Sequence, residues 1–174
     1  MLYTRIRFLL IILFIVLGLL LHIKMGIGSA WYLYLASLLL LATHFLFGTV
    51  GIAFAKLKAG KVKESEKIIN QVSKPQWLNK RHRAYYHFTK GMIALQQENL
   101  PAGEHNLNLA TQLGLRNDND RALALLNLAH ICYVQKRMDD SRNNLQKAKS
   151  FNADDLMIKQ NIEELEKVLA FPYN

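Results

Sequence analysis

Cysteine is nearly absent from this chain, since the 174 residues contain only Cys132. A single cysteine excludes an intrachain disulfide framework and any zinc site built from several cysteines. Cys132 lies in an apolar helical pattern, which favours core packing over a reactive thiol. We therefore expect a protein of a reducing compartment.

The chain also lacks the patterns of common catalytic sites. None of its six histidines stands four residues from another, and no His-Glu-x-x-His, phosphate-binding loop or nucleophile elbow occurs. Asp118 with Asp120, and Asp139 with Asp140, are expected in turns between helices, as solvated residues or helix caps. The sequence thus predicts no enzyme activity, no catalytic residue, no cofactor, no bound metal and no small-molecule substrate.

Charge is scarce at the start of the chain, where residues 1–55 carry only Arg5, Arg7 and Lys24. The net charge of +9 comes mainly from residues 1–83, which contain twelve Lys or Arg and two Glu. Because the remainder is nearly neutral, we expect no nucleic-acid partner. Basic residues that follow the apolar segments are instead predicted to contact anionic lipid head groups. These are Lys56, Lys58, Lys61 and Lys63.

Two apolar runs indicate a transmembrane hairpin over residues 1–55. A spanning helix needs ~20 apolar residues, and we predict spans over residues 6–23 and 31–55. Basic residues precede the first run and follow the second, which predicts both termini and the rest of the chain on the cytoplasmic face. Size and topology indicate a bacterial inner membrane. Alternatively, residues 1–30 are a cleaved signal peptide.

His44 lies near the middle of the second apolar run, and neither run contains an acidic partner for it. An ionisable group at that depth is a functional candidate. We favour a neutral histidine that is hydrogen-bonded across the hairpin over a role in proton handling.

Small residues recur at an interval of 38 residues in the remainder of the chain. A fixed period of this size is typical of stacked helical hairpins, which bind proteins more often than they form catalytic pockets. We therefore predict an all-α fold with repeats over residues 46–83, 84–121 and 122–154, the first sharing its leading helix with the second span. The recurring positions are Ala53, Gly91 and Ala129, then Ser65, Gly103 and Ser141, then Val72, Ala110 and Ala148.

The third repeat closely resembles the tetratricopeptide repeat (TPR). The residues that carry the resemblance are Asn127, Leu128, Ala129, Tyr133, Met138, Ser141 and Ala148. The interval exceeds the usual ~34 residues of that family, which implies longer linkers, around Lys74–Arg83 and Arg116–Arg121. Two apolar segments ahead of such repeats are also similar in architecture to the N-terminal part of HemY-type bacterial membrane proteins.

Residues 155–174 are predicted to form a capping helix and a tail. Such arrays need a terminal helix that covers the last repeat. We expect the helix over residues 155–170, with Asp154 or Asp155 as its N-cap. Its apolar stripe is Leu156, Ile162, Leu165 and Leu169.

The resemblance implies a partner-binding groove, because the first helix of each TPR hairpin lines a concave surface. The predicted groove residues are Tyr85, Phe88, Met92, Leu95, Leu123, Leu126, His130 and Tyr133. A stripe this apolar indicates an apolar helix or extended segment as ligand. Alternatively, these residues close on one another, or the C-terminal Phe171, Pro172 and Tyr173 cover them.

These features together predict a membrane-anchored scaffold or adaptor that binds a protein partner at the cytoplasmic face and aids assembly or recruitment of a membrane complex. The alternative is a fixed accessory subunit of a transporter, respiratory or secretion complex, with the hairpin as its main contact. A subunit is expected to co-purify stoichiometrically after mild detergent extraction, whereas an adaptor is expected to exchange.

Overall fold

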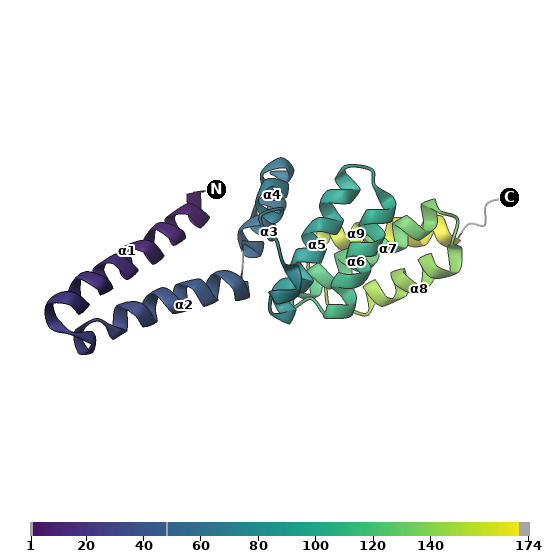
Figure 1. The fold of residues 1–174 in the computed structure, drawn as a ribbon. Helices are drawn as coiled ribbons and strands as arrows, with labels where there is room; N and C mark the ends of the chain where they lie inside the picture. Colours follow the sequence, from purple (N-terminus) through teal and green to yellow (C-terminus); the bar gives the residue numbers. More distant parts are fainter. Residues whose placement is uncertain (1, 48, 171–174) are drawn as a thin grey trace.

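The structure of the chain is a computed structural model that describes residues 2–47 and 49–170. Every regular element within these ranges is helical, which confirms the all-α class for the described residues. Figure 1 shows a hairpin of α1 and α2 to one side of a stack formed by α3 to α9. The helices are α1 (Leu2–Met25), α2 (Trp31–Phe47), α3 (Val50–Lys58), α4 (Val62–Ile69), α5 (Lys80–Gln96), α6 (Leu100–Leu113), α7 (Asp118–Val134), α8 (Met138–Lys149) and α9 (Leu156–Ala170).

The first two helices run antiparallel and contact each other closely. A Cβ built on Gly18 of α1 would lie only 2.9 Å from Cε1 of Tyr34 on α2, so the absent side chain permits the approach. Among the described residues, one helical segment, Phe8–Met25, is long and apolar enough to cross a membrane, and Trp31–Ala42 is a shorter apolar segment. The side chains of residues 43–47 lie outside the description, and the role predicted for His44 falls there.

The predicted continuous helix over residues 31–55 is instead two helices, since α2 ends at Phe47 and α3 begins at Val50. Val50 and Ala53 are fully buried in a cluster with Ile69, Leu78 and Ile93. Residues 50–55, predicted to lie in the second span, therefore pack in the helical stack against α4 and α5. The first hairpin of the stack has a leading helix of its own.

Helix positions in the stack recur at the 38-residue interval. Helices α4, α6 and α8 begin at residues 62, 100 and 138, and α5, α7 and α9 begin at residues 80, 118 and 156. The turn within each hairpin contains one residue in the left-handed region, at φ values of 71° for Gly60, 59° for Glu98 and 60° for Lys136. This residue ends the first helix of each hairpin, as the αL position does at many helix C-termini.

Each of these three turns contains the same type of backbone hydrogen bond. The backbone N–H of Lys61 donates to the carbonyl of Lys56 at 2.9 Å, and that of Asn99 donates to the carbonyl of Ala94 at 2.9 Å. In the third turn the N–H of Arg137 donates to the carbonyl of Cys132 at 2.8 Å. This six-residue bond is the Schellman closure of a helix, so the three hairpins α3–α4, α5–α6 and α7–α8 turn in the same way.

Small residues lie where the two helices of a hairpin touch. The buried Ser65 Oγ of α4 donates to the Ala53 carbonyl of α3 at 2.8 Å, and Ser141 Oγ of α8 donates to the Ala129 carbonyl of α7 at 2.8 Å. In the middle hairpin Gly103 stands at the serine position, and the Leu95 side chain fills the space that a Cβ would take. These contacts allow close helix approach.

Ser141→Ala tests this contact. Because Ser141 Oγ is fully buried and donates across the hairpin, its loss is expected to lower the unfolding free energy by about 1 kcal/mol. Ser150→Ala is the matched control, since the Ser150 hydroxyl is exposed and donates locally to the Lys147 carbonyl. Urea unfolding of the full chain in mild detergent, followed by circular dichroism, measures both. Equal losses would show that the buried hydrogen bond adds nothing.

The final helix packs against α7 and α8 and closes the stack. Asp155 is its N-cap, because its Oδ1 accepts from the backbone N–H of Met157 at 2.9 Å and of Ile158 at 3.3 Å. The prediction that Leu156 belongs to the buried stripe was wrong, because Leu156 is 68% exposed. The first buried residue of the stripe is Ile158. The remaining buried positions are Ile162, Leu165 and Leu169, as predicted.

The connections between hairpins begin and end earlier in the chain than predicted. Residues 70–79 join α4 to α5 and contain a short 3-10 helix, Pro75–Trp77, while residues 114–117 join α6 to α7. Lys80 to Arg83 lie in α5, and Asp118 to Arg121 lie in α7, so the last four residues of each predicted linker are helical. The hairpins accordingly begin at residues 50, 80 and 118 instead of 46, 84 and 122.

Candidate partner-binding groove

An open cavity of about 280 Å³ lies between α3, α5 and α7. Most of the side chains around it are apolar or aromatic, and the start of α4 closes one end. The lining residues are Phe54, Leu57, Lys58, Gly60, Val62, Phe88, Met92, Gln96, Asp120 and Leu123. A concave apolar surface with few polar groups is the usual form of a ligand-binding site.

Three aromatic rings form the wall between α3 and α5. The ring centroid of Phe54 lies 4.9 Å from that of Tyr85 and 5.8 Å from that of Phe88, and both pairs are edge-to-face. The Tyr85 and Phe88 centroids are 6.4 Å apart, also edge-to-face. These distances fall in the favourable range for aromatic pairs. The wall is therefore held by its own packing before any ligand binds.

A buried carboxylate lies beside this wall. Asp120, in the first turn of α7, is 4% exposed. Its Oδ2 accepts a hydrogen bond from the Tyr85 hydroxyl at 2.9 Å, and its backbone N–H donates to the Asn117 side chain. Burial, together with the Asp120 carboxylate, raises the pKa of Tyr85. The prediction that Asp120 is a solvated turn residue or a helix cap was wrong, because its buried side chain pairs with Tyr85 and Asn117 is the N-cap of α7.

Lys58, the last residue of α3, is the cationic partner of this carboxylate. Its Nζ lies 3.4 Å from Asp120 Oδ1 and 5.1 Å from the centroid of the Phe54 ring. The Lys58 side chain is 57% exposed, whereas that of Asp120 is 5% exposed. The ammonium group thus sits at the mouth of the cavity, between a buried carboxylate and an aromatic face.

The eight predicted groove residues lie in different environments. Phe88 and Leu126 are buried, at 2% and 6% exposure. Leu95 is half-buried and packs against Gly103 of α6. On α7, His130 is exposed and Tyr133 is half-buried, and both lie outside the cavity lining. The cavity brings together Phe88, Met92 and Leu123, with Tyr85 behind Phe54.

Sequence reasoning missed the contribution of α3. Phe54 and Leu57 stand 38 residues before Met92 and Leu95, so the repeat interval marks them as groove positions. They were assigned to the end of the second span and its margin instead of to a groove. The repeat interval does not indicate that Asp120 belongs to the groove. The residues offered as a cover for the groove, Phe171, Pro172 and Tyr173, lie outside the described residues.

The lysines predicted to contact lipid head groups mostly have acidic neighbours. Lys56 Nζ lies 2.8 Å from Glu64 Oε2, and this pairing lowers the pKa of Glu64. Lys61 Nζ lies 4.0 Å from the other Glu64 oxygen, and Lys58 pairs with Asp120. Lys63 is exposed. The positive charge that these residues offer to a membrane is therefore smaller than the sequence count suggests.

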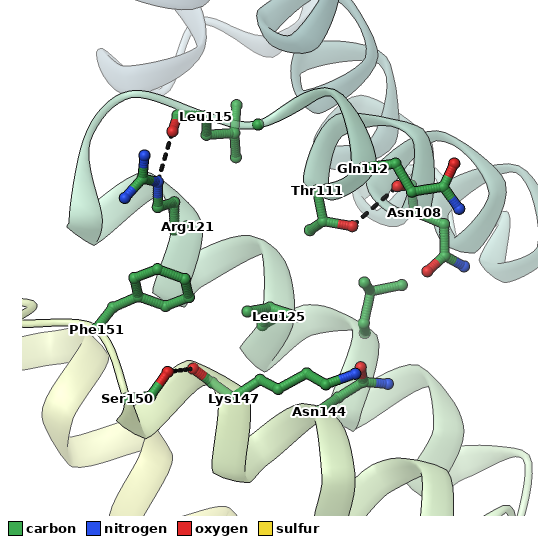
Figure 2. Close-up of a pocket in the computed structure, with 12 residues that line it drawn as sticks. Asn108, Thr111, Gln112, Leu115, Arg121, Leu125, Asn144, Lys147, Ser150 and Phe151 are labelled. Carbon is green, nitrogen blue, oxygen red and sulfur yellow. Dashed lines mark hydrogen bonds between the residues drawn. The ribbon is translucent and has the colours of Figure 1, made fainter.

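A second cavity of about 560 Å³ lies over α7, between α6 and α8 (Figure 2). Leu115, Leu125 and Leu128 contribute apolar surface, and the rim carries amides and hydroxyls from α6 and α8. Figure 2 shows Arg121 directed toward the Leu115 carbonyl, to which its Nε donates, while its guanidinium lies 5.5 Å from the centroid of Phe151. Arg121 thus contacts both Leu115 and Phe151 at the rim of this cavity.

Comparison of the chain with protein-family models, with curated proteins and with solved structures yields no match. Within the part of the chain that the structure describes, no group of three or more His, Cys, Asp or Glu side chains is placed to hold a metal ion. The burial of Cys132 raises its pKa, which disfavours the reactive thiolate at neutral pH. We base the proposed function on the groove between α3, α5 and α7, because the first helices of the three hairpins line it.

Proposed function

We propose that this protein is a membrane-anchored adaptor whose TPR-like stack binds an apolar segment of a protein partner at the cytoplasmic face of the inner membrane. The observation that carries the proposal is the apolar cavity between α3, α5 and α7, which presents Met92 and Leu123 at its surface. In this proposal α1 and α2 form the membrane hairpin, and both termini are cytoplasmic.

The recurrence within the stack supports the TPR-like assignment. The starts of the second helices, the left-handed turn residues and the turn hydrogen bonds all repeat at 38 residues over three hairpins. Repeated hairpins stack into a continuous core with a concave surface. In the TPR family, which the chain resembles, the first helix of each hairpin lines that surface. In this chain those helices are α3, α5 and α7, which are the helices around the cavity.

The exposure of α1 supports the anchor. Its large apolar side chains are widely exposed, for example Leu9 at 64%, Ile12 at 57% and Leu20 at 55%. Contiguous apolar surface of this kind is typical of contact with lipid or with other membrane helices. At 1.5 Å per residue the 24 residues of α1 extend about 36 Å, which exceeds the ~30 Å hydrocarbon thickness.

Site-specific photocrosslinking in cells tests the proposal. A photoreactive amino acid is placed at Met92 or Leu123, which line the groove and are partly exposed, and at the exposed Asn143 of α8, which lies outside the groove lining, as the control. We expect one dominant protein adduct from both groove positions and none from the control position. Mass spectrometry of the adduct identifies the partner.

Other outcomes would contradict the adaptor. Adducts only within the chain itself would show that the groove is filled by its own residues. A partner that stays bound in fixed stoichiometry after mild detergent extraction, and that crosslinks to α1 but not to Met92, would favour the accessory subunit of a membrane complex.

A further inference from the structure

We propose that the groove recognises a basic side chain within the apolar segment of the partner, and that Lys58 occupies this cation site while no partner is bound. The cation site consists of the Asp120 carboxylate and the ring face of Phe54. The inference rests on the proposed function, because it names the chemistry of the ligand that the groove takes.

The Asp120 carboxylate is incompletely neutralised by its present partners. A carboxylate at 4% exposure is costly unless it is paired and hydrogen-bonded. The Tyr85 hydroxyl donates one neutral hydrogen bond. The Lys58 ammonium lies at 3.4 Å, beyond the ~2.7–2.9 Å of a strong charge-assisted hydrogen bond. A cation with better geometry would therefore bind Asp120 more favourably than Lys58 does.

Lys58 is placed to exchange with a cation of the partner. Its side chain is 57% exposed, and an ammonium on a flexible four-carbon stem regains its hydration in solvent. Departure of Lys58 alone would leave the buried Asp120 carboxylate unpaired, so the exchange is favourable only when the partner's cation takes its place. The position of Lys58 is thus that of an internal competitor, which a cation of the partner replaces at Asp120.

Charge complementarity then specifies the ligand. Among the described side chains that line the cavity, Lys58 and Asp120 are the charged ones. When Lys58 swings out, a single negative charge remains among apolar and aromatic walls. An ammonium or guanidinium flanked by apolar residues matches this surface, and the Phe54 ring adds a cation–π contact. An acidic segment would meet the Asp120 carboxylate and be repelled.

Selection from a random peptide library displayed on phage tests the inference. The bait is the full chain in lipid nanodiscs, as wild type, as Asp120→Asn and as Lys58→Met. Asp139→Asn is the matched control, because Asp139 is fully exposed and is not part of the cavity lining. We expect wild type and Asp139→Asn to enrich apolar peptides that contain Lys or Arg, and Asp120→Asn to lose the basic preference.

The dissociation constant of one enriched peptide, measured for each variant, gives a quantitative test of the cation site. Replacing its basic residue by methionine should weaken binding to wild type roughly tenfold to a hundredfold, on the scale of a hydrogen bond to a charged group. The same replacement should have little effect with Asp120→Asn. Lys58→Met should tighten binding of the basic peptide, since the competitor is gone. Thermal unfolding of each variant checks the fold, and Lys58→Met decides the matter if Asp120→Asn is unstable.

Failure of the cation site and failure of the proposed function give different results in this experiment. Enrichment of apolar peptides without basic residues would overturn the cation site and leave the proposed function standing. Weaker binding of the basic peptide to Lys58→Met would also overturn it, since Lys58 would then act as part of the site. No enrichment above background with any bait would refute the groove as a peptide-binding surface, and with it both proposals.

Discussion

Gly91→Leu is expected to destabilise the stack by ~1–3 kcal/mol or more, the cost of overpacking a filled core. A Cβ at Gly91 would lie 2.8 Å from Cγ of Leu107 and 3.2 Å from its backbone nitrogen. Leu107 is fully buried in α6, so neither its side chain nor the helix backbone has room to retreat. Gly91→Ala should lower stability as well, although alanine favours a helix by ~1 kcal/mol over glycine.

Gly51→Ala provides the matched control. Gly51 lies in α3, and a Cβ there meets no atom within 4 Å. The substitution is expected to leave the unfolding free energy unchanged or to raise it by up to ~1 kcal/mol through helix propensity. Urea unfolding of both variants measures the difference. If Gly91→Ala stabilises the chain as much as Gly51→Ala does, then α5 and α6 do not approach as closely as the structure shows.

The recurrence of small residues predicted where the hairpins lie, because close helix crossings tolerate few residue types. Gly91 and Gly103 stand where a Cβ would collide with Leu107 and Leu95, so their spacing carries structural information. The turns were less predictable. Glu98 and Lys136 adopt the left-handed conformation that Gly60 adopts without strain. The closure of the helix end imposes that conformation, and residue type alone does not indicate it.

The break between α2 and α3 was not predictable from hydropathy. Val50 and Ala53 are as apolar as residues that face lipid, yet they are fully buried against Ile69 and Ile93. Apolar side chains suit a bilayer and a protein core equally, so an unbroken apolar run does not say where one helix ends and the next begins. The position of the break between α2 and α3 depends on the contacts of α3 with α4 and α5, which lie later in the chain.

The groove could be predicted as a region but not residue by residue. Periodicity places Phe88 and Met92 on one side of α5, whereas packing against α3 decides which of them is exposed. Asp120 was missed because its burial depends on the Tyr85 hydroxyl, 35 residues earlier in the chain. Long-range partners of this kind leave no local pattern in the sequence.

Phe88→Ala is expected to lower the unfolding free energy by ~3–5 kcal/mol, the range for truncating a buried aromatic side chain. Phe88 is 2% exposed and packs edge-to-face against the rings of Phe54 and Tyr85. Its removal opens a space between α3 and α5 that neither helix is free to fill. Thermal and urea unfolding, followed by circular dichroism, measure the loss.

Met92→Ala separates binding from folding on the same helix. Met92 lies one turn beyond Phe88, is only half-buried and lines the same cavity. We expect it to cost far less stability than Phe88→Ala while it weakens the crosslink from Leu123 to the partner. If Phe88→Ala instead unfolds like wild type but abolishes the crosslink, Phe88 is a contact residue, and the groove extends deeper between α3 and α5 than the aromatic wall allows.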